Sequence, residues 1–506
     1  MEPRKFYDER LNGLQALLKK MQKRKSSFAW LRLGTIVAIF FAFYLLWSAG
    51  AAYVIIASVL LVFIFIRIVY ADLNNQAKIE HTYHLININE DEIKCLAGDY
   101  YDFPDGAGHI PKDHPYANDL DIFGRASLFQ YINRTTSEMG SSQLAEYLKQ
   151  PSEINLILER QMALKELSSK TLWLQDLQAM GRKQQITFST KGRLNEWMKE
   201  PLSFSNFKHW KWLRYVLPLI IVSVVTFYIA DWVGDGLFYF TLLVFAFIVY
   251  QLNKKIAPIH EKLSRVADEL NILSESVAHT ENEHFESPLL KKMQAAIKGK
   301  HGKASKQILQ IKKILDRLDI GPNWPVSLPL NFLLLWNLQQ VLDLEKWKAR
   351  QKDSLDIWFD TLARFESLSS LAVLHFNHPE WIFPTIKEDY FSIEGTEIGH
   401  PLIPENKRVA NYIDISNNSK LMLVTGSNMA GKSTYLRSIG INVVLAMAGS
   451  PVCAAAFSVS HVNVISSMRI TDNLEESTST FYAELKKLKT IIEKVNNGER
   501  VFILLD

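Results

Sequence analysis

The sequence contains little cysteine and no large excess of either charge. Only Cys95 and Cys453 occur among 506 residues. They lie far apart and without metal-ligand spacing, so we interpret both as reduced thiols in a cytosolic compartment. The formal net charge is +4, which gives no global electrostatic argument for nucleic-acid binding. At about 150 residues per domain, the length predicts three or so units.

Charged side chains are absent from Leu33 to Ile66. A helix of this length would measure about 50 Å, whereas the hydrocarbon core of a membrane is roughly 30 Å thick. Two spans joined at Ser48-Ala49-Gly50 therefore fit better than one. A cleaved signal peptide is the alternative, but the apolar sequence resumes at once. We predict a basic cytosolic N-terminus over residues 1–26 and a first transmembrane hairpin over 27–70.

A second apolar pair comprises Tyr215 to Ala230 and Gly236 to Tyr250, divided by a turn with Asp231 and Asp235. Each half is at or below the short limit for a membrane span, and Pro218 lies inside the first. A buried core hairpin or a re-entrant loop is therefore the alternative to a transmembrane hairpin.

The charges that flank both apolar pairs favour the membrane. Basic residues lie before and after each pair, and around the second they are Lys208, Lys211, Arg214, Lys254 and Lys255. By the positive-inside rule, both hairpins start and end in the cytoplasm. We predict a second transmembrane hairpin over 206–252 and a multi-pass protein of the inner (cytoplasmic) membrane.

The remaining sequence up to residue 385 has mostly the three- and four-residue apolar spacing of helices. It predicts a helical domain over 71–205, with a loop at Tyr100 to Pro115, and further long helices over 253–385. A Gly/Lys-rich break at Lys298 to Lys303 interrupts the second part. The basic cluster there is interpreted as a solvated loop face, with contact to a phosphate backbone as the alternative; its members are Lys298, Lys300, Lys303 and Lys306.

The most specific motif is a glycine-rich loop between an apolar run, 421–424, and a predicted helix, 434–447. The run is predicted to be a buried strand. The loop and the residue after it are Gly426, Ser427, Asn428, Met429, Ala430, Gly431, Lys432, Ser433 and Thr434. Glycines allow backbone N–H groups to surround a β-phosphate, Lys432 reaches the β- and γ-oxygens, and the Ser433 hydroxyl binds Mg²⁺. These nine residues are therefore predicted to bind ATP.

Short strand patterns surround this loop at 391–393, 409–415 and 501–505. Together with the helix they predict an α/β nucleotide-binding domain over 386–506. Asp506 lies at the end of the last apolar strand, where an acidic residue is typical of a second Mg²⁺ anchor.

Thr425 to Arg437, with the sequence T-G-S-N-M-A-G-K-S-T-Y-L-R, resembles the MutS family of DNA mismatch-repair ATPases. Other segments resemble further parts of that family, namely Phe123–Leu148, His400-Pro401-Leu402, Gly449–Val452, Ser479-Thr480-Phe481 and Phe502–Asp506. The resemblance implies a multidomain protein: transmembrane helical hairpins, an all-α core and lever, and a C-terminal α/β P-loop ATPase domain of the ABC type.

The resemblance also implies roles for residues and partners. Family members dimerise through their ATPase domains, so we expect a homodimer in which Ser479 of one protomer contacts the nucleotide of the other. ATP and Mg²⁺ are the expected cofactors, with Lys432 and Asn428 as candidate catalytic residues. Asn428 would contact the γ-phosphate or the attacking water, or else stabilise the loop turn.

Two departures from the family pattern bear on function. The sequence contains no Phe-x-Glu, the wedge with which repair members recognise a mismatch. The family has a Glu directly after the Asp of the second acidic strand, whereas that Asp, Asp506, is the last residue here. We expect that the sequence is truncated at this strand. The alternative is a protein that binds ATP and hydrolyses it poorly.

Two functions remain open at this stage. One is an ATP-driven dimeric switch in the membrane that acts on or near DNA. The other is a membrane ATPase switch that acts on protein or lipid partners without binding DNA.

Overall fold

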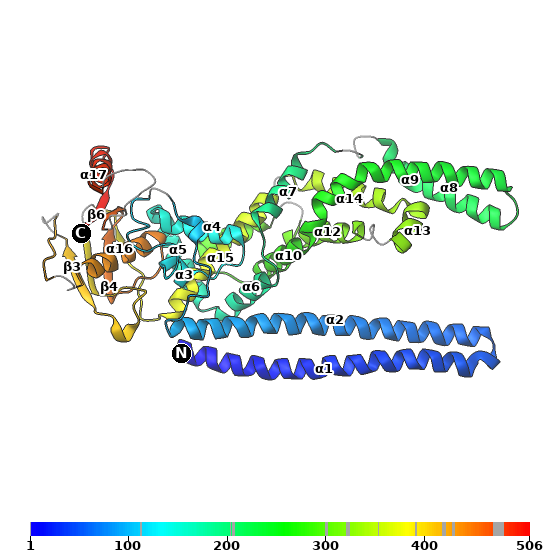
Figure 1. Ribbon diagram of the computed structural model, residues 1–506, viewed down its shortest axis with the longest axis horizontal. Helices are drawn as coiled ribbons and strands as arrows, with labels where there is room; N and C mark the ends of the chain where they lie inside the picture. Colours follow the sequence, from blue (N-terminus) through cyan, green and yellow to red (C-terminus); the bar gives the residue numbers. More distant parts are fainter. Residues whose placement is uncertain are drawn as a thin grey trace.

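The computed structural model describes residues 2–111, 114–202, 204, 208–298, 302–319, 324–352, 354–389, 392–416, 421–427, 431–468 and 480–506. The described chain is mostly helical and elongated (Figure 1). Two helical hairpins have their tips at one end of the long axis, and the strands lie at the opposite end (Figure 1). Core helices occupy the space between.

Hairpin 1 consists of α1 (Pro3–Leu46) and α2 (Ala51–Leu96). The basic N-terminal segment and the first apolar segment therefore form one continuous helix. The turn between the helices contains the 3-10 segment Trp47–Ala49 and Gly50, whose φ of 115° is accessible to glycine because it has no Cβ. This is the turn that the sequence predicted at Ser48 to Gly50.

Hairpin 2 consists of α8 (Lys208–Ile229) and α9 (Asp235–Leu263). In both hairpins, large apolar side chains face outward: Phe40, Phe63 and Leu243 are 72%, 61% and 70% exposed. Four helices of the described chain, α1, α2, α8 and α9, are long and apolar enough to cross a membrane.

Among the core helices, α15 (Leu355–Asn377) is buried along most of its length. The other core helices are α3 (Leu128–Ile132), α4 (Glu138–Lys149), α5 (Ile154–Ser168), α6 (Thr171–Lys183), α7 (Phe188–Lys199), α10 (Ala267–Asn282), α11 (Pro288–Ile297), α12 (Ala304–Leu318), α13 (Trp324–Leu334) and α14 (Trp336–Arg350). Helix α15 contacts α3, α4, α5, α6, α7, α10 and α11. Ser137 and Ser287 cap α4 and α11 by accepting backbone N–H groups of the first turn.

The helices predicted over 253–385 are interrupted at two places. A 3-10 turn, Ser264–Val266, separates α9 from α10. The break expected between Lys298 and Lys303 separates α11 from α12.

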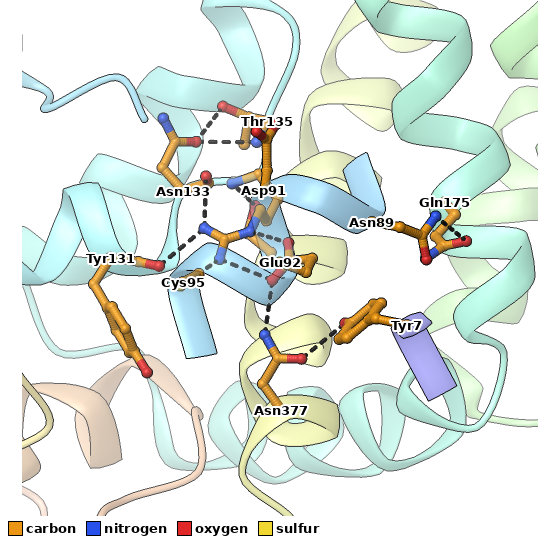
Figure 2. A network of polar contacts seen from close by, with 12 residues as sticks. Tyr7, Asn89, Asp91, Glu92, Cys95, Tyr131, Asn133, Thr135, Gln175 and Asn377 are labelled. Carbon is orange, nitrogen blue, oxygen red and sulfur yellow. Dashed lines mark hydrogen bonds and ion pairs between the residues drawn. The ribbon is translucent and has the colours of Figure 1, made fainter. Parts of the chain in front are cut away.

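A buried polar network fixes the root of hairpin 1 to the core (Figure 2). Arg134, after α3, forms an ion pair with Glu92 of α2, and a second contact between Arg134 Nη2 and Glu92 Oε2 measures 3.1 Å. Asn377 Nδ2 of α15 donates to Glu92 Oε2 at 2.8 Å, and the hydroxyl of Tyr7 in α1 donates to Asn377 Oδ1 at 2.8 Å. Four segments distant in sequence therefore meet at one point.

The strands form two sheets. The first has the order β1-β4-β2-β3 and contains β1 (Thr385–Lys387), β2 (Ile393–Ile398), β3 (Asn411–Ile415) and β4 (Ala456–Ser460). The second pairs β5 (Asn463–Ser467) with β6 (Val501–Leu505) in parallel. Helix α16 (Lys432–Ala448) packs on α4, α5 and β5, and α17 (Thr480–Asn496) also contacts β5.

The prediction of a buried strand at 421–424 is wrong for this structure. Residues 421–427 have no regular secondary structure, and Leu421 and Leu423 are 85% and 82% exposed. An apolar run becomes a buried strand only where a neighbouring strand supplies hydrogen bonds, and the described residues provide no such partner to this run.

Candidate functional site

The glycine-rich loop leads into α16 through Gly431, which has a φ of 84°. This left-handed conformation favours glycine and turns the chain into the helix. The predicted helix at 434–447 is thus confirmed and begins two residues earlier, at Lys432. Its first N–H groups lack intrahelical partners, as at any helix N-terminus.

Lys432 folds back over the loop that precedes it. Its Nζ donates to the carbonyl oxygens of Gly426 at 2.9 Å and Ser427 at 3.0 Å. The ammonium group is therefore held at the loop by two neutral acceptors, and the contact is exposed to solvent. A multivalent anion could replace such acceptors, because hydrogen bonds between charged groups are stronger.

Ser433 and Asp506 are in direct contact although 73 positions separate them. The Ser433 hydroxyl donates to Asp506 Oδ2, and the backbone N–H of Asp506 donates to Ser467 O at 3.1 Å. The parallel pairing of β5 with β6 holds the carboxylate beside the first turn of α16. The structure thus brings together the two residues that the sequence predicted as Mg²⁺ ligands.

A cavity of about 640 Å³ opens beside Lys432. This volume lies within the range of about 300–1,000 Å³ common for small-molecule sites. The hydroxyl of Tyr435 donates to Tyr412 O at 2.9 Å, which joins α16 to β3 across the cavity wall. The lining includes His400, Arg408, Tyr412, Thr425, Gly431, Lys432, Thr434 and Tyr435.

His400 is held neutral at the edge of this cavity. Burial lowers the pKa of its ring to about 4; Asp121 opposes this shift, whereas Arg437 and Arg408 add to it. His400 Nδ1 accepts the backbone N–H of Leu402 at 3.3 Å, which requires an unprotonated nitrogen.

Some predicted site residues lie outside the described residues: Asn428, Met429, Ala430 and Ser479. Their predicted roles remain predictions. Conversely, the sequence pattern did not single out Arg408, Tyr412 or Tyr435 as cavity residues. The strand prediction at 409–415 was the available signal for Tyr412, because β3 carries that residue to the cavity.

Residues 422–506 match the family model described as MutS domain V. Through this segment, the chain is related to the MutS family. A DNA mismatch repair protein MutS of Ehrlichia ruminantium is 34% identical over 160 residues, which cover 30% of this chain and 19% of that protein. A protein of the same name in Chlorobaculum parvum is 36% identical over 124 residues, covering 22% and 14%.

DNA mismatch repair protein MutS 1 of Haloarcula marismortui is 32% identical over 149 residues, covering 29% of this chain and 16% of that protein. The chain thus spans less than a fifth of the length of these MutS relatives. The MutS segment contains α16, β5, β6 and the Ser433–Asp506 contact.

Proposed function

We propose that this protein is a membrane-tethered MutS-family switch that binds ATP and Mg²⁺ at the loop before α16. One observation carries the proposal: the Ser433 hydroxyl lies against the Asp506 carboxylate, and Lys432, the preceding residue, donates to carbonyl oxygens of the loop. Residues 386–506 would be the P-loop ATPase domain and 71–205 and 253–385 the core and lever. Hairpins at 27–70 and 206–252 would lie in the membrane.

The oxygen atoms of Ser433 and Asp506 fit Mg²⁺, which prefers hydroxyl, carboxylate and water oxygens. When bound, the ion would neutralise phosphate charge. Lys432 would leave the carbonyl groups of Gly426 and Ser427 and contact the phosphates. The cavity beside Tyr412 and Tyr435 would hold the nucleoside.

The segment 400–408 offers a route from the nucleotide to hairpin 1. His400, Ile403 and Arg408 line the cavity beside the loop. Ile403 and Arg408 also line a second cavity, of about 1,020 Å³, against Arg4 of α1 and Leu96 of α2. A shift of this segment on nucleotide binding would therefore act on the root of hairpin 1.

Binding of a fluorescent ATP analogue by the detergent-purified full chain tests the nucleotide site. We expect Lys432→Ala to weaken binding about tenfold or more, because a hydrogen bond to a charged group is lost. Lys489→Ala, an exposed lysine of α17, is the matched control. Asp506→Asn should raise the Mg²⁺ concentration that binding requires. Unchanged affinity in Lys432→Ala would exclude the proposed site.

Insertion of the hairpins is tested by labelling introduced cysteines with a membrane-impermeant maleimide in intact cells. Ser48→Cys and Gly234→Cys lie at the two hairpin tips, and Gly192→Cys on α7 is the cytoplasmic control. Background labelling should be low, since Cys95 and Cys453 are buried. We expect labelling at both tips and none at the control before lysis. Labelling of the control alone would contradict the topology.

The names of the relatives favour action on or near DNA. The resemblance to the MutS family favours a homodimer through the ATPase domains. The two apolar hairpins at one end of the molecule favour the second candidate, a membrane switch that acts on protein or lipid partners (Figure 1). Retention of duplex DNA over a range of salt concentrations separates them, because phosphate contacts weaken steeply with salt. Binding that is absent even at low salt would exclude the DNA-acting function.

A further inference from the structure

An open groove of about 630 Å³ lies between α12 and α14, away from the nucleotide site. Buried Ile314 and Trp347 form its floor. Its rims are exposed and strongly basic. They carry Lys306, Lys313 and Arg317 on α12 and Lys346 and Arg350 on α14.

The positions of these five cations follow helical spacing. Lys313 and Arg317 are four residues apart, as are Lys346 and Arg350, so each pair lies on one face of its helix. None of the five forms an ion pair with another described residue. The one acidic residue of the lining, Asp343, is within 3.5 Å of Arg214 Nη1. The groove therefore concentrates positive charge that lacks a counterion from the described chain.

One end of the groove lies at the foot of hairpin 2. Asn337 Nδ2 at the start of α14 donates to Asn253 Oδ1 at 3.1 Å, where the apolar part of α9 ends. The indole of Trp336 donates to Arg317 O at 2.8 Å, which places that end of α12 at the same level. The groove continues away from the hairpin to Trp347, whose Nε1 donates to Gln307 O at 2.9 Å.

An apolar surface adjoins that end. Helix α13 belongs to a run without charged residues, 320–342, and leads into α14. The ring of Phe332 lies 5.6 Å from that of Phe245 in hairpin 2. Leu333 and Leu334 are 38% and 39% exposed. Apolar surface and uncompensated cations thus meet at the level where an acyl chain and its headgroup would meet.

We propose that this groove binds the phosphate headgroup of an anionic phospholipid. The inference rests on the proposed membrane insertion of hairpin 2. Basic clusters directly cytoplasmic of a membrane helix attract anionic lipids. A headgroup phosphate would accept hydrogen bonds from Arg317 and Lys313 and relieve the repulsion among the five cations. Its acyl chains would lie against α13 and hairpin 2.

The full chain, purified in a nonionic detergent, is titrated with short-chain phosphatidylglycerol and, separately, with short-chain phosphatidylcholine, inorganic phosphate and duplex DNA. We expect saturable binding of phosphatidylglycerol only. The triple substitution Lys313→Gln, Arg317→Gln and Arg350→Gln should weaken it about tenfold or more, since each basic residue contributes substantially near an anionic surface. These side chains are exposed, so the fold should persist.

A charge-matched control removes three exposed lysines of and next to α11: Lys291→Gln, Lys292→Gln and Lys298→Gln. The charge-conserving variant Lys313→Arg with Arg317→Lys and Arg350→Lys should retain binding. An equal loss of phosphatidylglycerol binding in the groove triple and in the α11 control triple would overturn the inference. Binding of inorganic phosphate as tightly as the lipid would overturn it as well. DNA binding that disappears only in the groove triple would assign the groove to nucleic acid instead. Maleimide labelling at the hairpin tips separates failure of membrane insertion from failure of the groove.

Discussion

The two hairpins are alike in composition and differ in how they join the rest of the molecule. Hairpin 1 has helices of 44 and 46 residues, and their polar halves run along the core toward the strands (Figure 1). Hairpin 2 has helices of 22 and 29 residues and joins the core near α13 and α14. Hairpin 1 therefore spans most of the long axis, whereas hairpin 2 ends at the core helices α13 and α14.

Their attachments differ in chemistry as well. The root of hairpin 1 is a buried ion pair, Glu92–Arg134, with both side chains 3% exposed. The corresponding ion pair of hairpin 2, Arg214–Asp343, has side chains that are 23% and 41% exposed. Removing one partner of a buried ion pair destabilises a protein strongly, whereas removing one partner of an exposed pair destabilises it little. Hairpin 1 is thus suited to move together with the strand end of the molecule, and hairpin 2 to adjust independently.

Arg134→Met should produce the largest effect. It leaves the Glu92 side chain buried and without its main partner, which costs about 3–5 kcal/mol. We expect a marked fall in the thermal unfolding midpoint of the detergent-purified chain, together with increased proteolysis of α1. A fall no greater than that of Arg214→Met would remove the distinction between the two roots.

Acidification should lower the stability of the folded chain at its strand end through His400. Its pKa is about 4 in the folded chain, against an ordinary value near 6.5, so below pH 6.5 the unfolded chain binds a proton that the folded chain does not. Stability is lost as the pH falls from 6.5 toward 4, by up to about 3 kcal/mol. His400→Gln should lose less stability than the parent between pH 7.5 and 5. If the unfolding midpoints of His400→Gln and of the parent change with pH in the same way, His400 does not cause the effect.

Tyr7→Phe tests the link between α1 and α15 with a smaller change. It removes the hydrogen bond to Asn377 and leaves a buried acceptor, at a cost of about 1–3 kcal/mol. Tyr250→Phe in α9, where the ring is 65% exposed, is the matched substitution in hairpin 2 and should change stability by less than about 0.5 kcal/mol. Comparable unfolding midpoints for the two variants would count against a specialised root in hairpin 1.

Arg214→Met should have the smallest effect. The Arg214–Asp343 pair is partly exposed and measures 3.5 Å, so its loss costs about 0–1 kcal/mol. The unfolding midpoint should move little, and less still at high salt, which already screens the pair. A large fall would mean that hairpin 2 is anchored as firmly as hairpin 1.

The sequence by itself determined the local features. It located the hairpin turn at Ser48 to Gly50, the tip of hairpin 2, the helix after the glycine-rich loop, and β6. It also singled out Lys432, Ser433 and Asp506. These predictions succeeded because charge-free runs, glycine positions and apolar spacing act over a few neighbouring residues.

Only the tertiary structure decided which distant residues meet. Glu92 and Arg134 became partners, Ser433 came to lie against Asp506, and both hairpin tips came to lie at one end (Figures 1 and 2). The apolar run 421–424, which has the composition of a buried strand, remained exposed. The physical reason is that the burial of a segment and its pairing with other strands depend on which distant parts of the chain lie beside it. The apolar spacing within the segment does not specify those neighbours.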